Sequence, residues 1–254
     1  MHMLGPSGRQ HGLLWPTGHP GQTVAQDGGT GAHCAAASER GSALMASSMS
    51  SRMRDGVDRN APAYWDARFS EDGFAYGTEP NDFLRLVADR LPGGDALCLC
   101  EGEGRNATFL AQRGMRTTAM DFSAVALRKA EGLAAQRGLR LQILCCDLAG
   151  FDPGAGRWDV ITMIFGQPDP LLRRALYARL AACLRPGGAL VLETKVEEDA
   201  ASDSRYPGSS VLCAELAGLD FAIARDSTRV LREGRYHDGE QRTAQILAFR
   251  PSYP

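Results

Sequence analysis

The chain has 254 residues, of which 44% are hydrophobic and 23% are charged, so it is long enough to bury a full core. Its formal net charge of -2 leaves no excess of positive charge, which argues against nucleic acid and against an anionic membrane surface as partners. No apolar run approaches the roughly 20 residues that a membrane-spanning helix needs. We therefore expect a soluble, cytoplasmic protein.

Residues 1–58 differ in composition from the remainder of the chain. They are rich in Gly, Ser, Ala, His and Gln and have no apolar periodicity, so they cannot bury enough surface to become ordered. We predict a disordered N-terminal extension over residues 1–58 and one folded domain over residues 59–254. A targeting segment and a start codon assigned too far upstream are the alternatives, although no secretory signal of the basic-then-apolar kind is present.

From residue 95 onward, predicted strands alternate with predicted helices. Apolar runs indicate seven strands, at residues 95–100, 116–120, 139–146, 158–165, 189–194, 219–224 and 243–249. Ser123 is a typical N-cap residue for the helix after the second strand, and Gly138 ends that helix. Leucines at every fourth position from Leu172 to Leu184 indicate a long helix before the fifth strand.

Nearly continuous apolar strands separated by amphipathic helices are typical of a parallel sheet with helices on both faces. Such sheets bind their ligands at the carboxyl ends of the strands. We therefore predict an α/β, Rossmann-like fold and look for the site at the strand ends.

A Gly-x-Gly turn follows the first strand. Gly102 and Gly104 allow backbone conformations that other residues avoid, and the helix that starts near Arg105 presents free N–H groups to a ligand. About 20 residues beyond the turn, Asp121 closes the second strand, where a carboxylate is able to accept both hydroxyl protons of a ribose. The same pattern is found in dinucleotide-binding proteins. It therefore predicts a cofactor that contains adenosine but does not distinguish a dinucleotide from another adenosine ligand.

The wider set of motifs resembles the class I S-adenosylmethionine-dependent methyltransferases. The resemblance covers roughly residues 60–250 and rests on Glu-Gly-Glu-Gly-Arg-Asn at residues 101–106, on Asp121, on Asp-Leu at residues 147–148 and on Leu-Arg-Pro-Gly-Gly at residues 184–188. It implies a seven-stranded, mostly parallel sheet whose last strand is antiparallel. It also implies S-adenosylmethionine as the cofactor.

A lead-in segment, residues 64–83, narrows the resemblance to the branch of thiopurine and tellurite methyltransferases. It contains Tyr-Trp-Asp-Ala-Arg-Phe and Phe-Ala-Tyr-Gly-Thr-Glu-Pro-Asn-Asp-Phe. In the resembled branch such a segment folds over the cofactor. Trp65, Phe74 and Tyr76 then form an apolar lid over the methyl group. The alternative is that these aromatic side chains only cover the edge of the sheet.

The resemblance also implies how individual residues of these motifs contact the cofactor. Asp147 and the amide after it face the adenine, and Glu101 holds the methionine ammonium. Arg105, Tyr76 and Thr78 are candidates near the methionine carboxylate or the substrate. The cofactor-binding set that we predict is Glu101, Gly102, Glu103, Gly104, Arg105, Asp121, Phe122, Asp147, Leu148, Ile164 and Tyr76.

The segment after the fourth strand narrows the methyl acceptor. Residues 164–170 lack the Asn/Asp-Pro-Pro-aromatic motif of amino-group methylation and the Pro-Cys pair of cytosine C5 enzymes. We therefore expect a small molecule as the methyl acceptor. We also expect the protein to be a monomer. The resemblance favours a soft nucleophile, such as a thiol or a selenium or tellurium species. No catalytic side chain is assigned, because a general base is required only if the acceptor arrives protonated.

Two other classes of protein fit part of the pattern. A nicotinamide-dependent oxidoreductase shares the glycine loop and Asp121, but none of the six tyrosines has Lys four positions later to form a Tyr-x-x-x-Lys pair. A non-catalytic cofactor-binding module keeps the cofactor residues and lacks the acceptor pocket. The sequence alone does not separate this module from an enzyme.

Cysteine and histidine usage predicts no metal site. The seven cysteines lack metal-ligand spacing, and we expect Cys98, Cys100, Cys145 and Cys146 in inner strands as small buried residues. At Cys98 and Cys100 the resembled family usually has Asp and Gly. Four of the five histidines lie within residues 1–58, and the fifth, His237, is expected to be a solvated turn residue rather than a catalytic group.

Overall fold

A computed structural model describes residues 61–197 and 203–252. The predicted extension over residues 1–58 lies outside the described residues, and so does the predicted domain boundary. Within the described ranges, none of the helices combines the length and the apolar character that crossing a membrane requires.

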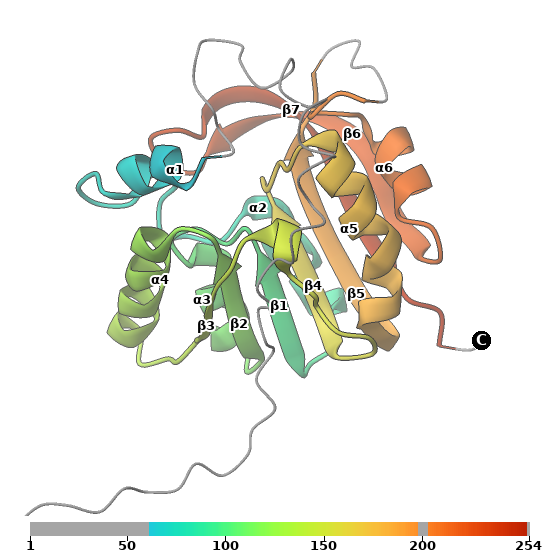
Figure 1. Ribbon diagram of the computed structural model, residues 1–254, viewed down its shortest axis with the longest axis horizontal. Coiled ribbons are helices and arrows are strands. Elements are labelled where there is room, and N and C mark those ends of the chain that lie inside the picture. The colour runs from blue at the N-terminus through green and yellow to red at the C-terminus, as the bar shows by residue number, and fades with distance from the viewer. Residues whose placement is uncertain (1–60, 198–202, 253–254) are drawn as a thin grey trace, which may run out of the picture. The chain divides into compact units, whose positions relative to one another are not determined.

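The centre of the fold is one seven-stranded sheet. Its strands are β1 (Asp95–Leu99), β2 (Arg116–Asp121), β3 (Gln142–Cys145), β4 (Trp158–Ile164), β5 (Leu184–Lys195), β6 (Asp220–Arg232) and β7 (Asp238–Phe249). They lie in the order β3-β2-β1-β4-β5-β7-β6 (Figure 1). Strands β1 to β5 pair in parallel, while β7 is antiparallel to both of its neighbours. This arrangement confirms the predicted Rossmann-like fold with an antiparallel last strand.

Six α-helices surround the sheet in the described part of the chain. They are α1 (Pro62–Phe69), α2 (Asp82–Val87), α3 (Arg105–Gln112), α4 (Ala124–Gln136), α5 (Pro170–Cys183) and α6 (Ser209–Glu215), and two short 3-10 helices are η3 (Ala88–Arg90) and η4 (Leu148–Gly150). Helix α1 overlaps the start of the lead-in segment and α2 begins at its end, and the sequence analysis assigned neither helix.

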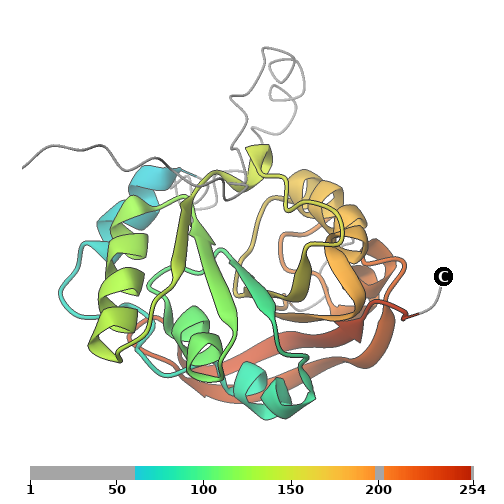
Figure 2. The same ribbon diagram turned by 90° about the horizontal axis from the view of Figure 1, so that it is seen from below.

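The sheet separates two apolar layers. Because side chains alternate along a strand, Leu97 and Leu99 of β1 pack with α5 and α6, whereas Ala96 and Cys98 pack with α2 and α3. Figure 2 shows these helix pairs on opposite sides of the sheet. Burial on both faces explains why β1 reads as a continuous apolar run.

Local signals in the sequence act as predicted around β2 and α4. Asp121 is the last residue of β2, and the Ser123 hydroxyl accepts a hydrogen bond from the Ala126 amide at the start of α4. The helix ends at Gln136, and Gly138 follows with φ +70°, a conformation that favours glycine.

The β6–β7 hairpin is longer than predicted. Strand β6 continues to Arg232 and β7 begins at Asp238, so both strands extend well past their apolar parts. The added residues are mostly polar, and backbone pairing between β6 and β7 holds them in the strand conformation. In Figure 1 the hairpin arches over the top of the sheet toward α1. At its tip, a Cβ on Gly234 would lie 2.5 Å from the Cα of Tyr76, so the backbones touch there.

Two of the cysteines, Cys145 and Cys100, do not lie in inner strands as predicted. Strand β3 is shorter than predicted and lies at the sheet edge, where Cys145 is exposed and its Sγ lies 3.6 Å from the Phe122 carbonyl oxygen. Cys100 lies just beyond β1 rather than inside it. Cys98 and Cys146 are buried, as expected. An edge strand has a neighbour on one side only, which the apolar run at residues 139–146 does not reveal.

Candidate functional site

A cavity of about 620 Å³ lies where β1, β2, β3 and β4 end. The turn after β1, the helix α1 and the tip of the β6–β7 hairpin complete its wall. All residues of the predicted cofactor-binding set line this cavity except Gly104. Thr78 and Phe74 are also outside the lining, so the structure does not bring these two candidates to the site.

The turn after β1 needs glycine for two different reasons. Gly102 has φ +65° and Gly104 has φ +88°, in the left-handed region that other residues avoid. A Cβ on Gly104 would also lie 2.5 Å from the Cβ of Ala130, so Gly104 allows α3 to pack closely on α4. Cys100 has φ +52°, and it stands at the position where the resembled family usually has glycine.

Glu101 holds the loop against the first turn of α3. Its Oε1 accepts hydrogen bonds from the amides of Asn106 at 2.9 Å and Ala107 at 2.8 Å. Burial raises the pKa of Glu101 to about 7, although these two hydrogen bonds and Arg105 favour the charged form. A positively charged ligand group beside this carboxylate would lower the pKa again.

We expect the stability of the cofactor-free protein to fall between about pH 5 and pH 7. In this window the folded protein keeps the proton on Glu101, whose pKa is about 7, while the unfolded chain has lost it. The folded state therefore binds more protons, and its advantage disappears as the pH rises through 7. Urea unfolding should show a fall on the order of 1–3 kcal/mol.

Asp121, with a pKa raised by burial to about 6, contributes a smaller fall in the same direction. Glu101→Gln keeps an oxygen for the two amides and removes the titrating group. The variant should therefore lose the larger part of the fall. An unchanged pH dependence in Glu101→Gln would show that this carboxylate is not the group responsible.

Two further carboxylates lie at neighbouring strand ends. Asp121, at the end of β2, accepts hydrogen bonds from the amides of Gly102 and Ser123, both at 2.9 Å. Asp147 follows β3, and its Oδ1 accepts from the Ala149 amide at 2.9 Å at the start of η4. The structure thus brings both predicted acids to one cavity, where each also fixes the local backbone.

Glu103 faces the lead-in segment with its side chain. Its Oε2 accepts from the Ala75 amide at 2.8 Å, and its Oε1 forms an ion pair with Lys129 at 3.0 Å. Lys129 also donates to the carbonyl oxygens of Glu71 and Gly73. Both carboxylate oxygens of Glu103 are therefore engaged in holding the lead-in segment, which leaves its backbone for contact with a cofactor.

Aromatic side chains form the α1 side of the cavity. Trp65 stacks on Phe69 with 5.7 Å between ring centroids, and Phe69 lies 6.2 Å from Tyr76. A Cβ on Gly102 would approach the Phe69 ring to 3.3 Å, so this ring covers the glycine turn. Two of the three predicted lid residues, Trp65 and Tyr76, line the cavity.

His237 is not the solvated turn residue that the sequence analysis predicted. Its side chain is buried in the cavity wall, 4.5 Å from Tyr76 and 4.3 Å from Phe165 between ring centroids. The pKa of His237 is lowered to about 3, mainly by burial and in addition by the charges of Lys195 and Arg105. The imidazole is therefore neutral at physiological pH. The turn residues at 234–239 suggested that the His237 side chain is exposed. The lead-in segment packs against this side of the turn and covers the side chain.

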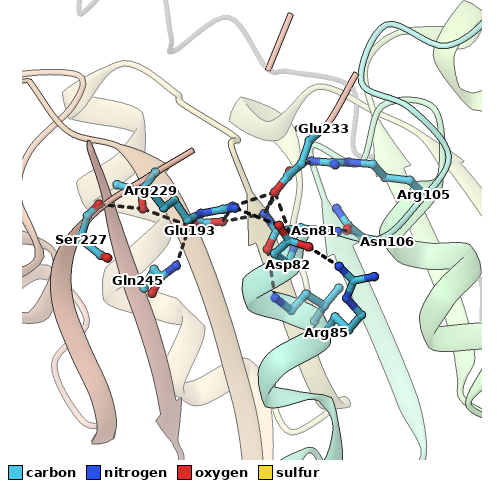
Figure 3. Close-up of polar contacts among 12 residues, drawn as sticks. Asn81, Asp82, Arg85, Arg105, Asn106, Glu193, Ser227, Arg229, Glu233 and Gln245 are labelled. Atoms are coloured by element: carbon cyan, nitrogen blue, oxygen red, sulfur yellow. Dashed lines mark hydrogen bonds and ion pairs between the residues drawn. The ribbon is translucent and has the colours of Figure 1, made fainter. Parts of the chain in front are cut away.

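A buried network of charges connects the hairpin to the cavity (Figure 3). Arg105 donates through Nη2 to Glu233 at 2.7 Å, and Arg229 donates through Nη2 to Glu233 and to Glu193, both at 2.7 Å. Asn81 donates to Glu193 at 2.6 Å and to Glu233 at 3.1 Å. Burial raises the pKa of Glu233, but Arg105 and Arg229 outweigh it, so this pKa lies below its ordinary value. The network joins α3, β5, β6 and the lead-in segment.

Sequence reasoning missed several residues of the cavity wall. Lys195 closes β5 in the way that Asp121 closes β2, so the rule of strand ends was a usable signal for it. Arg205 and Tyr206 also line the cavity, but they come from the connection after β5, which has no such pattern.

Comparison with known proteins shows which domain this part of the chain is similar to. Residues 96–188 match the family model of a methyltransferase domain. Over these residues the chain is similar to a methyltransferase domain. The matched residues run from β1 to the start of β5, which are the elements that end at the cavity.

The methyltransferase domain has a curated relative in Mycobacteroides abscessus, named 2-heptyl-1-hydroxyquinolin-4(1H)-one methyltransferase. The two are 26% identical over 122 residues, which cover 47% of this chain and 54% of the relative. The match thus spans about half the length of the curated relative.

Solved structures share the fold of the methyltransferase domain. One comes from work on the conversion of a disulfide bond into a thioacetal group during echinomycin biosynthesis. It has a TM-score of 0.61 and 15% identity, and the match covers 76% of this chain and 93% of that chain. TehB from Haemophilus influenzae has a TM-score of 0.55 and 14% identity, with 74% of this chain and 66% of that chain covered. At these identities the likeness shows the fold alone.

S-adenosylmethionine is the cofactor that the match to a methyltransferase domain implies. The residues present fit it, because the cavity has the volume of a typical small-molecule site and carries buried acids for its cationic and hydroxyl groups. Among the residues that the structure describes, no cluster of His, Cys, Asp or Glu is placed to hold a metal ion.

Proposed function

We propose that the protein transfers the methyl group of S-adenosylmethionine to a nucleophilic group of a small molecule. The observation that carries this proposal is the set of three carboxylates, Glu101, Asp121 and Asp147, around one cavity at the strand ends. Glu101 and Asp121 are buried and have raised pKa values, so they favour a ligand that brings a cation and hydroxyl donors.

Each residue of the cofactor site then has a physical task. Asp121 accepts hydrogen bonds from the ribose hydroxyls, Asp147 accepts from the adenine amino group, and Glu101 faces the methionine ammonium. The remaining contacts come from backbone groups of the glycine turn and from side chains that border the adenine or the methionine: Gly102, Glu103, Phe122, Leu148, Ile164 and Tyr76. Arg105 lines the same cavity as a candidate near the methionine carboxylate or the substrate. Gly104 supports this site through its packing on Ala130.

The bound cofactor supplies a methyl group on positively charged sulfur, which a nucleophile is able to displace in line. The chain's own contribution is to align the acceptor with that methyl group and to exclude water. The rings of Trp65, Phe69 and Tyr76 support this role, since Trp65 stacks on Phe69 and Phe69 meets Tyr76 edge to face, which gives an apolar cover on one side of the cavity.

For the acceptor, we propose a soft nucleophile: a thiol, or a selenium or tellurium species. The lead-in motif and the fold shared with TehB support it. A heteroaromatic hydroxyl is a second candidate, because the curated relative is named for a hydroxyquinolone and the aromatic wall suits a flat ring. Mass spectrometry of methylated products, after incubation with a panel of both chemistries, separates the two candidates. Any methylated product rules out a non-catalytic module.

S-adenosylmethionine and S-adenosylhomocysteine should raise the melting temperature, whereas NAD and NADP should not. A ligand that prefers the folded state stabilises it, so thermal shift assays measure the preference directly. Asp121→Ala should weaken cofactor binding by about 1–3 kcal/mol, through the loss of charge-assisted hydrogen bonds to the ribose. Asp220→Ala, at the exposed start of β6, is the matched control and should bind as the unmodified protein does. A shift with NAD alone would contradict the proposed function.

A further inference from the structure

Two nitrogen atoms in the cavity wall have no hydrogen-bond partner in the part of the chain that the structure describes. They are Nη1 of Arg105 and Nδ1 of His237. Both side chains line the cavity, and only 5% of Arg105 and 8% of His237 is exposed. Buried polar groups in proteins are almost always hydrogen-bonded, and leaving one unpaired costs about 1–3 kcal/mol. A ligand in the cavity is therefore the natural partner of both atoms.

Charges are distributed unevenly around the cavity. Acids at the ends of β1, β2 and β3 face the predicted cofactor positions, whereas Arg105 and Lys195 lie on the side of His237. Burial is the main reason that the His237 imidazole stays neutral; these two cations add to its effect, and Glu233 opposes it. An anion on this side would be attracted by both cations and would find hydrogen-bond donors already in place.

Glu233 determines how Arg105 presents its charge. The carboxylate binds Nη2 of Arg105 at 2.7 Å, and it is itself held by Arg229 at 2.7 Å. The side chain of Glu233 is 4% exposed and that of Arg105 is 7% exposed, so this pair is desolvated and has little freedom. With Nη2 engaged, Nη1 is the nitrogen that remains for a ligand.

Resting on the proposed function, we propose that Arg105 and His237 form the subsite for the methyl acceptor and that this subsite selects acceptors that bind as anions, such as thiolates or oxyanions. Nη1 of Arg105 and Nδ1–H of the neutral His237 donate to the anion. An acceptor that arrives ionised has no proton to lose, so the reaction needs no general base. This explains why the cavity pairs a cationic side with a histidine that does not titrate near neutral pH.

The first test uses benzoate and benzamide, which share size and shape and differ in charge. Calorimetry is done near neutral pH with protein saturated by S-adenosylhomocysteine, so the cofactor position is filled and activity is not the readout. Benzoate should bind at least about tenfold more tightly than benzamide, because charge-assisted hydrogen bonds are worth about 1.5–3 kcal/mol. Equal binding of the two probes would overturn the anion-selective subsite.

The second test places the subsite at His237. His237→Phe keeps an aromatic ring between Tyr76 and Phe165 and, since the imidazole is neutral, leaves the charge unchanged. It should weaken benzoate about tenfold and leave S-adenosylhomocysteine binding unchanged. Asp238→Asn, at the exposed neighbouring position, should leave both unchanged. If His237→Phe does not fold, His237→Gln offers an amide donor in its place and should keep the preference for benzoate.

The outcomes separate this inference from the function on which it rests. If unmodified protein does not bind S-adenosylhomocysteine, the proposed function fails and the subsite fails with it. If it binds the cofactor product but His237→Phe retains full benzoate affinity, the subsite alone is wrong. If His237→Phe loses cofactor affinity instead, His237 belongs to the cofactor position and the assignment is likewise wrong.

Discussion

Replacing Gly104 with alanine is expected to destabilise the fold by about 3–5 kcal/mol and to abolish cofactor binding. The new Cβ would lie 2.5 Å from the Cβ and 2.6 Å from the Cα of Ala130. Neither atom is able to move away, because Ala130 is a fully buried residue in the middle of α4. Relief of the clash must therefore displace the turn after β1, whose backbone lines the cavity.

Gly114 is the matched control for this substitution. It has φ +85°, nearly the same as the +88° of Gly104, but a Cβ there would have no atom within 4 Å. Gly114→Ala should therefore cost only the backbone strain, about 1–2 kcal/mol, and should bind S-adenosylmethionine normally. Urea unfolding and calorimetry measure both quantities. Similar losses in the two variants would mean that the contact with Ala130 is not what requires glycine.

Replacing Glu233 with glutamine should lower the free energy of unfolding by about 3–5 kcal/mol. The substitution keeps the shape and removes the negative charge that Arg105 and Arg229 share at 2.7 Å. Arg229 keeps its ion pair with Glu193, but Arg105 loses the carboxylate that holds its Nη2. A buried arginine without its partner is the source of the cost.

Glu240 provides the comparison for Glu233. It lies on β7 near the same hairpin tip and is exposed, so Glu240→Gln makes the same chemical change in water. Its effect should stay within about 0.5 kcal/mol. Chemical denaturation of both variants at one pH measures the two changes in the free energy of unfolding. A loss below about 1 kcal/mol in Glu233→Gln would show that the ion pair contributes little, as is common for solvent-exposed pairs.

Several features of the fold and site follow from local patterns in the sequence. The apolar strands, the Ser123 cap and the glycine turn predicted the sheet, the helix α4 and the place of the cavity. Asp121 and Asp147 were found because parallel strands end at one edge of the sheet, so that residues far apart in the chain meet there by rule. Such features depend on neighbours within a few residues or on a regular topology.

Other features depend on contacts between segments that no local pattern connects. Asn81, Glu193 and Glu233 come from the lead-in segment, β5 and the residue after β6, and they meet only when the hairpin folds back over the sheet. The same contact buries His237, which its turn-rich surroundings suggested to be solvated.

The sequence by itself determined the sheet, the glycine turn and the acids at the strand ends, because periodicity and backbone conformation are local properties. Only the tertiary structure decided which side chains line the cavity beside the hairpin tip. The positions of Arg105 and His237 there depend on Glu233 and on the packing of the hairpin tip against Tyr76. Burial and electrostatic pairing are properties of the assembled chain, so they arise only from the tertiary fold.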